Sequence, residues 1–268
     1  RLMARALKAI EKGAQPVEEA PVEEAPAKPV VVLPKPGSYG ILTADAELIQ
    51  TDGSSITIRA GESVETRRGE GDRLVVEVMT GQAGKVGTVD PELFKAQPRL
   101  SKDDDGSTDD YSYQKYEGEL FLARDGVKAP SVQDVDQGAL GDCYLIAAMG
   151  SVAAANPGII KDMISYDAGS GQYTVTFQEM QRGGIFKPHK ETVDSYMPTR
   201  RGGSGPGRMA YAMSDSTFNP NNQALWPAII EKAYAQWKGG YDAIGGGGVS
   251  AQAMQAFTGV RSVRVAMP

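Results

Sequence analysis

Two reactive residue types are nearly missing from this 268-residue chain, which has one cysteine and one histidine. A single cysteine excludes a disulfide framework within the chain; it fits a reducing compartment, and it also fits those exported bacterial proteins that carry no disulfides. No stretch approaches the roughly 20 apolar residues of a membrane-spanning helix, and residues 1–12 lack the uninterrupted apolar core of a secretory signal. The formal net charge of -6 provides no general attraction to nucleic acid or to an anionic membrane. We therefore expect a soluble protein with no nucleic-acid partner and no membrane span. The sequence leaves its compartment open, with the bacterial cytoplasm and export both as candidates.

The pattern along the chain predicts an α+β protein with linkers. Residues 14–36 form a Pro/Glu-rich tract in which PVEEA occurs twice, and such a composition buries too little apolar surface to fold. The chain starts at Arg1 and stops at Pro268 after an apolar run, which indicates that both ends were cut from a longer polypeptide. The predicted segments are a short helix (1–13), a disordered linker (14–36), a β-domain (37–97), an acidic linker (98–118) and a mixed α/β region (119–268).

Short alternating runs separated by turns predict a small β-barrel over residues 37–97. Its last portion, GKVGTV at residues 84–89, resembles the closing strands of an SH3-like module. A docking role and a plain β-module are equally compatible with this pattern.

In residues 119–268 the apolar periodicity predicts four helices and a strand. The alanine-rich run over 141–155 predicts a buried helix, and Asn156-Pro157 starts a second, short one. A strand is predicted around 173–177 and a hairpin connection over 187–190. A helix over 222–237 has an Asn cap and a Gly-Gly stop, and a last helix covers 250–257.

Cys143 lies where a glycine-containing loop meets the start of the predicted helix 141–155. Free N–H groups and the helix dipole favour a thiolate at such a position. The N–H of Cys143 and the side-chain amide of Gln137, six residues upstream, can together stabilise an oxyanion. A lone cysteine at the start of an apolar helix is as often a buried core residue. The position of Cys143 alone therefore does not decide between a catalytic thiol and a core residue.

Residues 137–145 have the sequence QGALGDCYL, which closely resembles the active-site signature of calpain-like cysteine proteases, a variant of the papain fold. Four further blocks follow in the family's order, and the resemblance covers about residues 119–260. These blocks are VDSYMPT (193–199), LWPAIIEKAYA (225–235), GGYDAIGGG (239–247) and AFTGV (256–260).

The resemblance implies the nucleophile-bearing subdomain of a cysteine endopeptidase that acts on protein or peptide substrates. Cys143 would be the nucleophile and Gln137 the oxyanion-hole donor. The residues implied in substrate binding are Gly141, Asp142, Gly246 and Gly247.

Two departures from the family pattern limit this reading. The family's catalytic His and Asn follow the Gly-rich loop in a second subdomain, whereas the one histidine here, His189, precedes that loop and is predicted to lie on the surface. We therefore expect the fragment to be inactive without the downstream catalytic subdomain of its parent chain. Animal calpains bind calcium partly through an acidic residue at the position of Ala224, and Asp134 alone provides too few carboxylates. No cofactor and no calcium switch of that kind are expected.

Other functions remain open at this point. The region can be a degenerate protease module that acts as a binding or structural domain of a larger multidomain protein. A transglutaminase-like acyl transferase uses similar thiol chemistry and is a more distant alternative.

Overall fold

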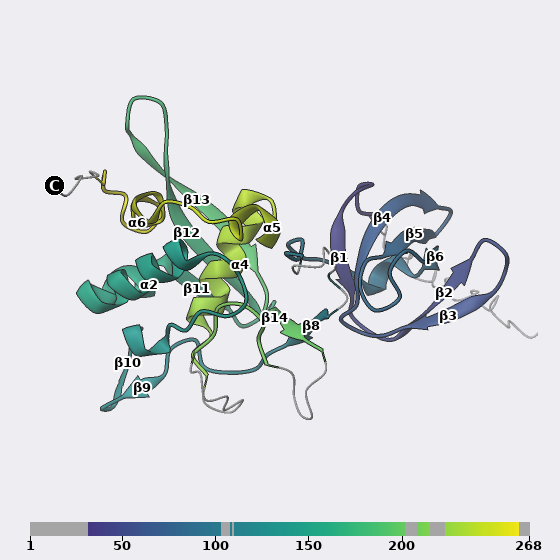
Figure 1. Ribbon diagram of the computed structural model, residues 1–268, viewed down its shortest axis with the longest axis horizontal. Helices are drawn as coiled ribbons and strands as arrows, with labels where there is room; N and C mark the ends of the chain where they lie inside the picture. The colour runs from purple at the N-terminus through teal and green to yellow at the C-terminus, as the bar shows by residue number, and fades with distance from the viewer. Residues whose placement is uncertain (1–31, 103–107, 109, 202–207, 215–222, 263–268) are drawn as a thin grey trace, which may run out of the picture. The chain divides into compact units, whose positions relative to one another are not determined.

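The computed structural model describes residues 32–102, 108, 110–201, 208–214 and 223–262 (Figure 1). The chain divides into the units Arg1–Val32 and Leu33–Pro268, and every element described below belongs to the second unit. The predicted helix over 1–13 and most of the predicted linker over 14–36 lie outside the described residues.

The N-terminal part of this second unit is an antiparallel sheet of seven strands, with a short 3-10 helix (η1, Pro91–Leu93) before its last strand. Alternating apolar residues from facing strands fill its core, among them Leu48, Val64 and Val76. In chain order the strands are β1 (Tyr39–Leu42), β2 (Ala46–Gln50), β3 (Ser55–Ile58), β4 (Ser63–Glu70), β5 (Arg73–Val78), β6 (Val86–Val89) and β7 (Phe94–Ala96).

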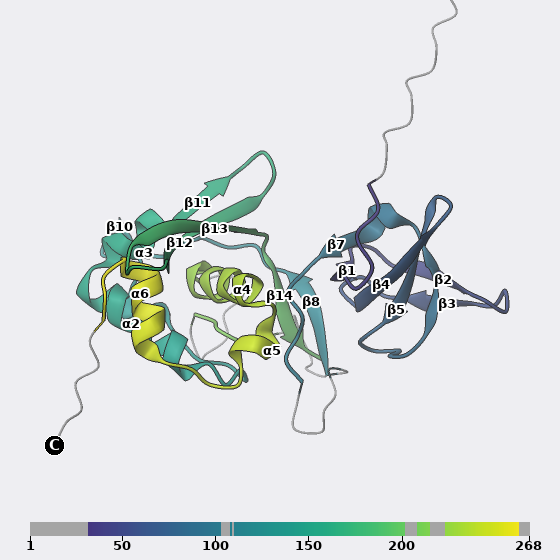
Figure 2. The same cartoon turned by 90° about the horizontal axis from the view of Figure 1, so that it is seen from above.

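This sheet is open, so the predicted closed barrel is not confirmed. The strand order is β3-β2-β6-β5-β4-β1-β7, and within the described residues the edge strands β3 and β7 do not pair with each other. Of the four residues of β3 only Ile58 is buried. The β2–β3 hairpin projects from the sheet (Figure 2). Strand β3 offers little apolar surface that could be buried by closing the sheet into a barrel.

Among the described residues, the second part of the unit contains five α-helices, one short 3-10 helix and several short ladders. Strands β11, β12 and β13 form one antiparallel sheet, β8 pairs with β14, and β9 pairs with β10. Strand β8 lies inside the segment predicted as an acidic linker. The elements are β8 (Tyr111–Lys115), β9 (Ala123–Arg124), β10 (Val127–Lys128), η2 (Val132–Asp134), α2 (Cys143–Ala155), α3 (Pro157–Met163), β11 (Ile164–Asp167), β12 (Gln172–Met180), β13 (Phe186–Val193), β14 (Tyr196–Arg200), α4 (Trp226–Lys238), α5 (Tyr241–Ile244) and α6 (Ser250–Thr258).

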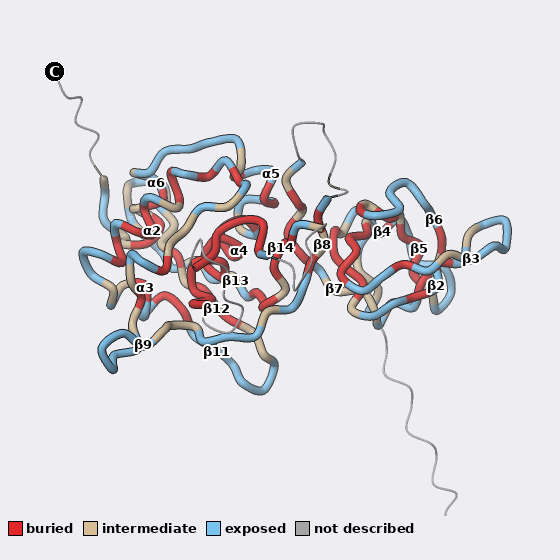
Figure 3. Tube along the Cα trace, turned by 60° about the horizontal axis from the view of Figure 1, so that its bottom comes forward, coloured by how far each residue is buried: buried red, intermediate tan, exposed pale blue. Residues whose placement is uncertain are grey.

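Helix α4 is the centre of this region. All ten residues from 226 to 235 are buried (Figure 3), and the helix contacts β12, β13 and α5. Helices α2 and α6 pack on each other, and α6 also packs on β12. The predicted helices over 141–155, from 157 and over 250–257 are confirmed as α2, α3 and α6.

Two predicted boundaries were wrong. Helix α4 begins at Trp226 with Leu225 as its N-cap rather than with an Asn cap at 222, although Pro227 does lie in its first turn and Gly239, at φ 105°, ends it. The predicted hairpin connection over 187–190 is part of β13, where His189 pairs with Phe177. The turn lies nearer to residues 181–185, where the N–H of Gln181 bonds to the carbonyl of Ile185.

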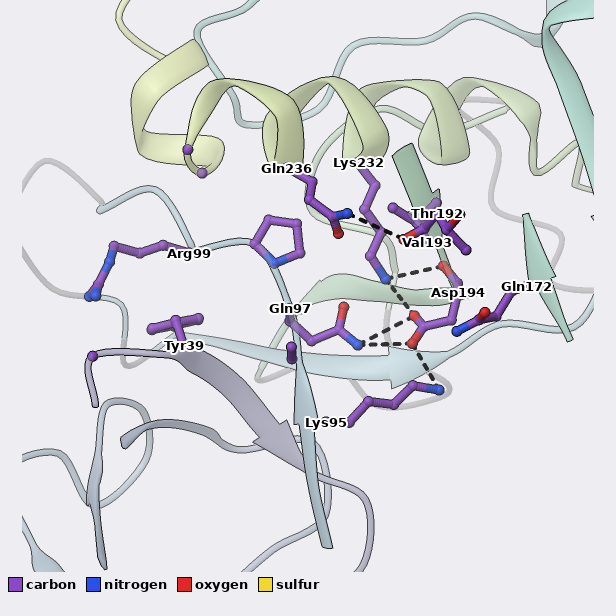
Figure 4. A pocket seen from close by; sticks show the side chains of 15 residues that line it. Tyr39, Lys95, Gln97, Arg99, Gln172, Thr192, Val193, Asp194, Lys232 and Gln236 are labelled. Carbon is purple, nitrogen blue, oxygen red and sulfur yellow. Dashed lines mark hydrogen bonds and ion pairs between the residues drawn. The ribbon is translucent and has the colours of Figure 1, made fainter. Parts of the chain in front are cut away.

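A buried ion pair joins α4 to the segment between β13 and β14. Lys232 Nζ donates to Asp194 Oδ1 at 2.5 Å and to the carbonyl of Tyr196 at 2.6 Å. The same carboxylate accepts from Gln97 Nε2 at 3.0 Å and pairs with Lys95 at 2.9 Å (Figure 4). Four of these residues, Lys95, Gln97, Asp194 and Lys232, line a cavity of about 600 Å³.

The charges in this cavity satisfy one another. Burial lowers the pKa of Lys232 to about 8 despite the attraction of Asp194. Burial would raise the pKa of Asp194, but the charge and hydrogen bond of Lys232 hold it below its ordinary value. The pair is therefore ionised at neutral pH, and we assign it a structural role.

Among the described residues no single helix is long and apolar enough to cross a membrane. Helices α2 and α3 meet the length and composition criteria only together, and they are bent by 114° relative to each other.

Candidate active site

Cys143 is the first residue of α2 and its side chain is exposed. The preceding Asp142 occupies the N-cap position, yet its side chain bonds to no N–H of the first turn. The carbonyl of Asp142 accepts from the N–H of Leu145 at 2.7 Å, which starts the helix. The thiol thus lies at a helix N-terminus whose first N–H groups have no side-chain cap, an environment that favours an anion.

A buried segment, residues 209–214, fixes the loop before the cysteine. Asp136 and Met213 exchange two backbone hydrogen bonds, of 2.9 and 3.1 Å, and the N–H of Ala139 donates to the carbonyl of Ala210 at 2.7 Å. Gly138 fits closely here, because a Cβ at this position would lie 2.2 Å from the carbonyl oxygen of Ala210. Only glycine allows this approach of the two backbones.

The Gln137 side chain is exposed, and its Nε2 donates to the carbonyl of Leu140 at 2.8 Å. Its amide is thus oriented by the same loop that leads to the cysteine. A side-chain amide has two N–H donors, so this bond leaves one free for a ligand. Its role as oxyanion donor remains a prediction.

The structure brings the Gly-rich loop, residues 245–248, to the nucleophile loop. The N–H of Gly247 donates to the carbonyl of Gly141 at 3.1 Å. A Cβ on Gly141 would lie 2.3 Å from the carbonyl oxygen of Gly245, and a Cβ on Gly248 would lie 2.6 Å from the ring of Tyr144. Glycines are therefore required on both sides of this contact.

The other predicted substrate-binding residues differ in exposure. Gly246 is exposed, and a Cβ there would have no heavy atom within 4 Å, so the space on that side of its Cα is open. The side chain of Asp142 is fully buried. A substrate contact by Asp142 would have to use its backbone, and that role stays a prediction.

The sequence of this region matches a known protein family. The family described as calpain family cysteine protease matches residues 118–267, more than half of the chain. The chain belongs to the calpain family.

Individual calpains are similar over the same region. The calpain-1 catalytic subunit of Rattus norvegicus is 35% identical over 136 residues, and calpain-9 of the same species is 32% identical over 130 residues. The calpain-2 catalytic subunit of Gallus gallus is 33% identical over 134 residues. In each case the match covers 47% of this chain and 16% of the calpain, so the chain matches only a small part of these relatives.

The one histidine of this calpain-family chain is bonded within the sheet region. The Nε2 of His189 lies 2.7 Å from a carboxylate oxygen of Glu191, and its ring stacks on Trp237 with centroids 4.6 Å apart. None of the described contacts of His189 involves the loop that carries Cys143. The structure therefore supplies no imidazole for the thiol from within the described residues.

The position that matches a calpain calcium ligand does not fit that ion here. Asp134 is fully buried, and its carboxylate accepts from Trp226 Nε1 and from the N–H of Ser131, both at 2.9 Å, and from the guanidinium of Arg124. Ala224 provides no carboxylate. Within the described residues there is also no group of three or more His, Cys, Asp and Glu side chains suited to a metal. Because Arg124 already supplies the positive charge at Asp134, this carboxylate does not fit a calcium ion.

Replacement of Arg124 by Gln should lower the free energy of unfolding by about 1–3 kcal/mol, because the buried Asp134 loses its charged hydrogen-bond partner. The size is limited because the Arg124 side chain is 40% exposed. Chemical denaturation of the 268-residue chain measures the effect. The control is Lys128→Gln, which removes an exposed ion pair with Glu119 and should change stability by less than about 1 kcal/mol. Calorimetric binding of calcium by the unsubstituted chain, lost in Asp134→Asn, would contradict this assignment.

Three features of the site were not predicted from sequence: the buried segment 209–214, the Arg124–Asp134 pair and the burial of Glu231. Of the three, only Glu231 could have been noticed in the sequence, because it is an acidic residue inside the apolar helix pattern that begins at Trp226. An acidic side chain is seldom fully buried unless it has a partner, so its place in this pattern indicates a buried polar interaction.

Proposed function

We propose that the chain is the nucleophile-bearing part of a cysteine endopeptidase. The observation that carries this proposal is the exposed Cys143 at the start of α2, beside a Gly-rich loop that is hydrogen-bonded to the nucleophile loop through Gly247 and Gly141. Membership of the calpain family supports it.

In the proposed reaction the Cys143 thiolate attacks the carbonyl carbon of a peptide bond. The N–H of Cys143 and the Nε2 of Gln137 stabilise the resulting oxyanion. Collapse of this intermediate breaks the C–N bond, and an imidazolium protonates the departing amine. Water then hydrolyses the thioester, releasing a carboxylic acid and returning the thiol.

The 268 residues supply the nucleophile but not the base. His189, their one histidine, is engaged with Glu191 and Trp237 in β13 and α4. We propose that the base comes from a further catalytic subdomain of the parent chain and that the fragment alone does not hydrolyse peptides.

We propose an extended peptide as the substrate. Gly246 and Gly247 are exposed and carry no side chains, so their backbone groups other than the Gly247 N–H, which bonds to Gly141, can bond to the backbone of an extended chain. Recognition through the backbone favours unfolded segments of proteins.

The test compares the longer parent chain with the 268-residue chain on an unfolded protein such as reduced casein. Hydrolysis by the parent and none by the fragment supports the proposal. No hydrolysis by a folded parent, with or without calcium, would favour the second candidate below.

Gln137→Ala in the active parent should lower kcat by about 10²–10³, the usual effect of removing one oxyanion donor. The KM for a peptide substrate should change little, because the donor acts mainly in the transition state. Steady-state kinetics measure both constants. The matched control is Gln133→Ala, an exposed glutamine of η2; equal losses in the two variants would count against a role for Gln137.

The second candidate function is a degenerate protease module that binds a partner. It is favoured by the seven-stranded domain outside the family match, for which we propose an SH3-like docking role. The intact Cys143 and Gln137 argue against it, because a binding module has no chemical need for both.

A further inference from the structure

Two carboxyl groups meet in the interior directly beside the nucleophile. Glu231 on α4 is 1% exposed, and Asp142, the residue before Cys143, is 0% exposed. In the described part of the chain no Lys, Arg or His side chain is found to bond to or act on either carboxyl. Buried carboxylates without a cation are costly, so this pair needs an explanation.

A proton shared by the two carboxyl groups would explain how they are buried together. Both oxygens of Glu231 accept from the N–H of Ala212, at 3.0 and 3.1 Å. No hydrogen-bond donor from another described residue is found for either Asp142 oxygen. The groups that act on this carboxyl are the Glu231 carboxyl and the N–H of Asp142 itself. Two carboxyl groups can bond to each other only when one of them carries a proton.

The electrostatics agree with this geometry. Burial raises the pKa of Asp142 to about 6, and burial followed by the charge of Asp142 raises the pKa of Glu231 well above its ordinary value. Both directions favour retention of one proton by the pair, which would let a carboxylic acid bond to a carboxylate.

The pair holds both ends of the nucleophile loop. Glu231 fixes Ala212 in the buried segment 209–214, and this segment is hydrogen-bonded to residues 136–139. Asp142 is the last residue of that loop before Cys143. The chain of contacts from α4 thus reaches both the oxyanion donor and the nucleophile.

We propose that Asp142 and Glu231 share one proton and that this bridge positions the loop that carries Gln137 and Cys143. Neither side chain is exposed to substrate, so both are positioning residues. Their importance for catalysis rests on the proposed function.

The residues packed around Asp142 and Glu231 contribute little change of charge with pH, so the pair itself is the main site of such a change. Lys232, the next residue of α4, bonds to Asp194 instead. Helix α6 contributes no titratable side chain to the packing on α2. The titratable groups that act on the pair or lie beside it are Cys143 and Tyr144 of α2, Tyr211 of segment 209–214 and Tyr241 of α5, and burial raises the pKa of all three tyrosines so that they stay neutral.

The test uses the 268-residue chain and the variants Asp142→Asn, Glu231→Gln and the double variant, with Glu47→Gln on the exposed face of β2 as a matched control. The rate of Cys143 alkylation by iodoacetamide is followed from pH 4 to 9. For the unsubstituted chain we expect an inflection near pH 6 that is lost in the double variant. In each single variant the new amide donates to the remaining carboxylate and stabilises its charged form, so the inflection should move to lower pH. The rate changes should be roughly 3- to 30-fold and should not multiply in the double variant.

Infrared spectroscopy of the unsubstituted chain at pH 7 gives a readout that does not depend on the folding of any variant. One protonated carboxylic acid per chain should appear in the carbonyl-stretch region. No such band, or alkylation profiles of folded variants that superimpose on that of Glu47→Gln, would overturn the proposal. Neither measurement requires hydrolysis, so failure of the shared proton and failure of the protease function are distinguishable.

Discussion

Replacement of Cys143 by Ala in the active parent chain should reduce hydrolysis of an unfolded protein by at least about 10⁴-fold. The Cys143 thiol is exposed at the N-terminus of α2, and the 268 residues contain no second cysteine that could replace it. Loss of the nucleophile in a catalytic unit removes nearly all catalysis that the oxyanion hole and binding do not supply. Initial rates with a fluorescent casein substrate measure the effect.

The control for this substitution is Ser151→Ala, a change of similar size at an exposed position of the same helix. Among the described residues the Ser151 hydroxyl is found to bond to the carbonyl of Ala147 within α2, so its loss should leave the rate within about twofold. Comparable activity of the Cys143→Ala and unsubstituted chains would remove Cys143 from the mechanism, whatever the family.

Replacement of Lys232 by Met should lower the free energy of unfolding by about 3–5 kcal/mol, the range for breaking a buried ion pair from one side. Lys232 is 1% exposed and donates to Asp194 and to the carbonyl of Tyr196, so the substitution leaves a buried charge and acceptors with fewer donors. Urea denaturation of the 268-residue chain, monitored by tryptophan fluorescence, gives the value.

Lys95 provides a matched control because it pairs with the same carboxylate from a position that is 36% exposed. Solvent screening limits such a pair to about 1 kcal/mol or less, so Lys95→Met should be mild. Addition of Asp194→Asn to Lys232→Met should restore part of the loss by removing the unpaired charge. If Lys232→Met cost no more than Lys95→Met, the buried pair would not be an important contributor to stability.

The accuracy of the sequence predictions varied with how local the signal was. Helices α2, α3 and α6 follow from apolar periodicity and from prolines and glycines near their ends, and all were predicted. The start of α4 was misplaced, because the structure caps this helix with Leu225 rather than with an asparagine. His189 was predicted to lie in a hairpin connection over 187–190, whereas pairing with β12 extends strand β13 through these residues.

By itself the sequence determined the chemistry that this chain can carry: one thiol at a loop-to-helix junction, one histidine outside the motif, and glycine-rich blocks in the order of the calpain family. These are properties of residue type and spacing, which need no contacts to be recognised. Tertiary structure alone decided that the β-domain stays open, that Arg124 occupies Asp134, and that Glu231 meets Asp142. Each of these depends on segments far apart in the chain being brought together by burial of apolar surface, and no local pattern encodes which polar groups will then face one another.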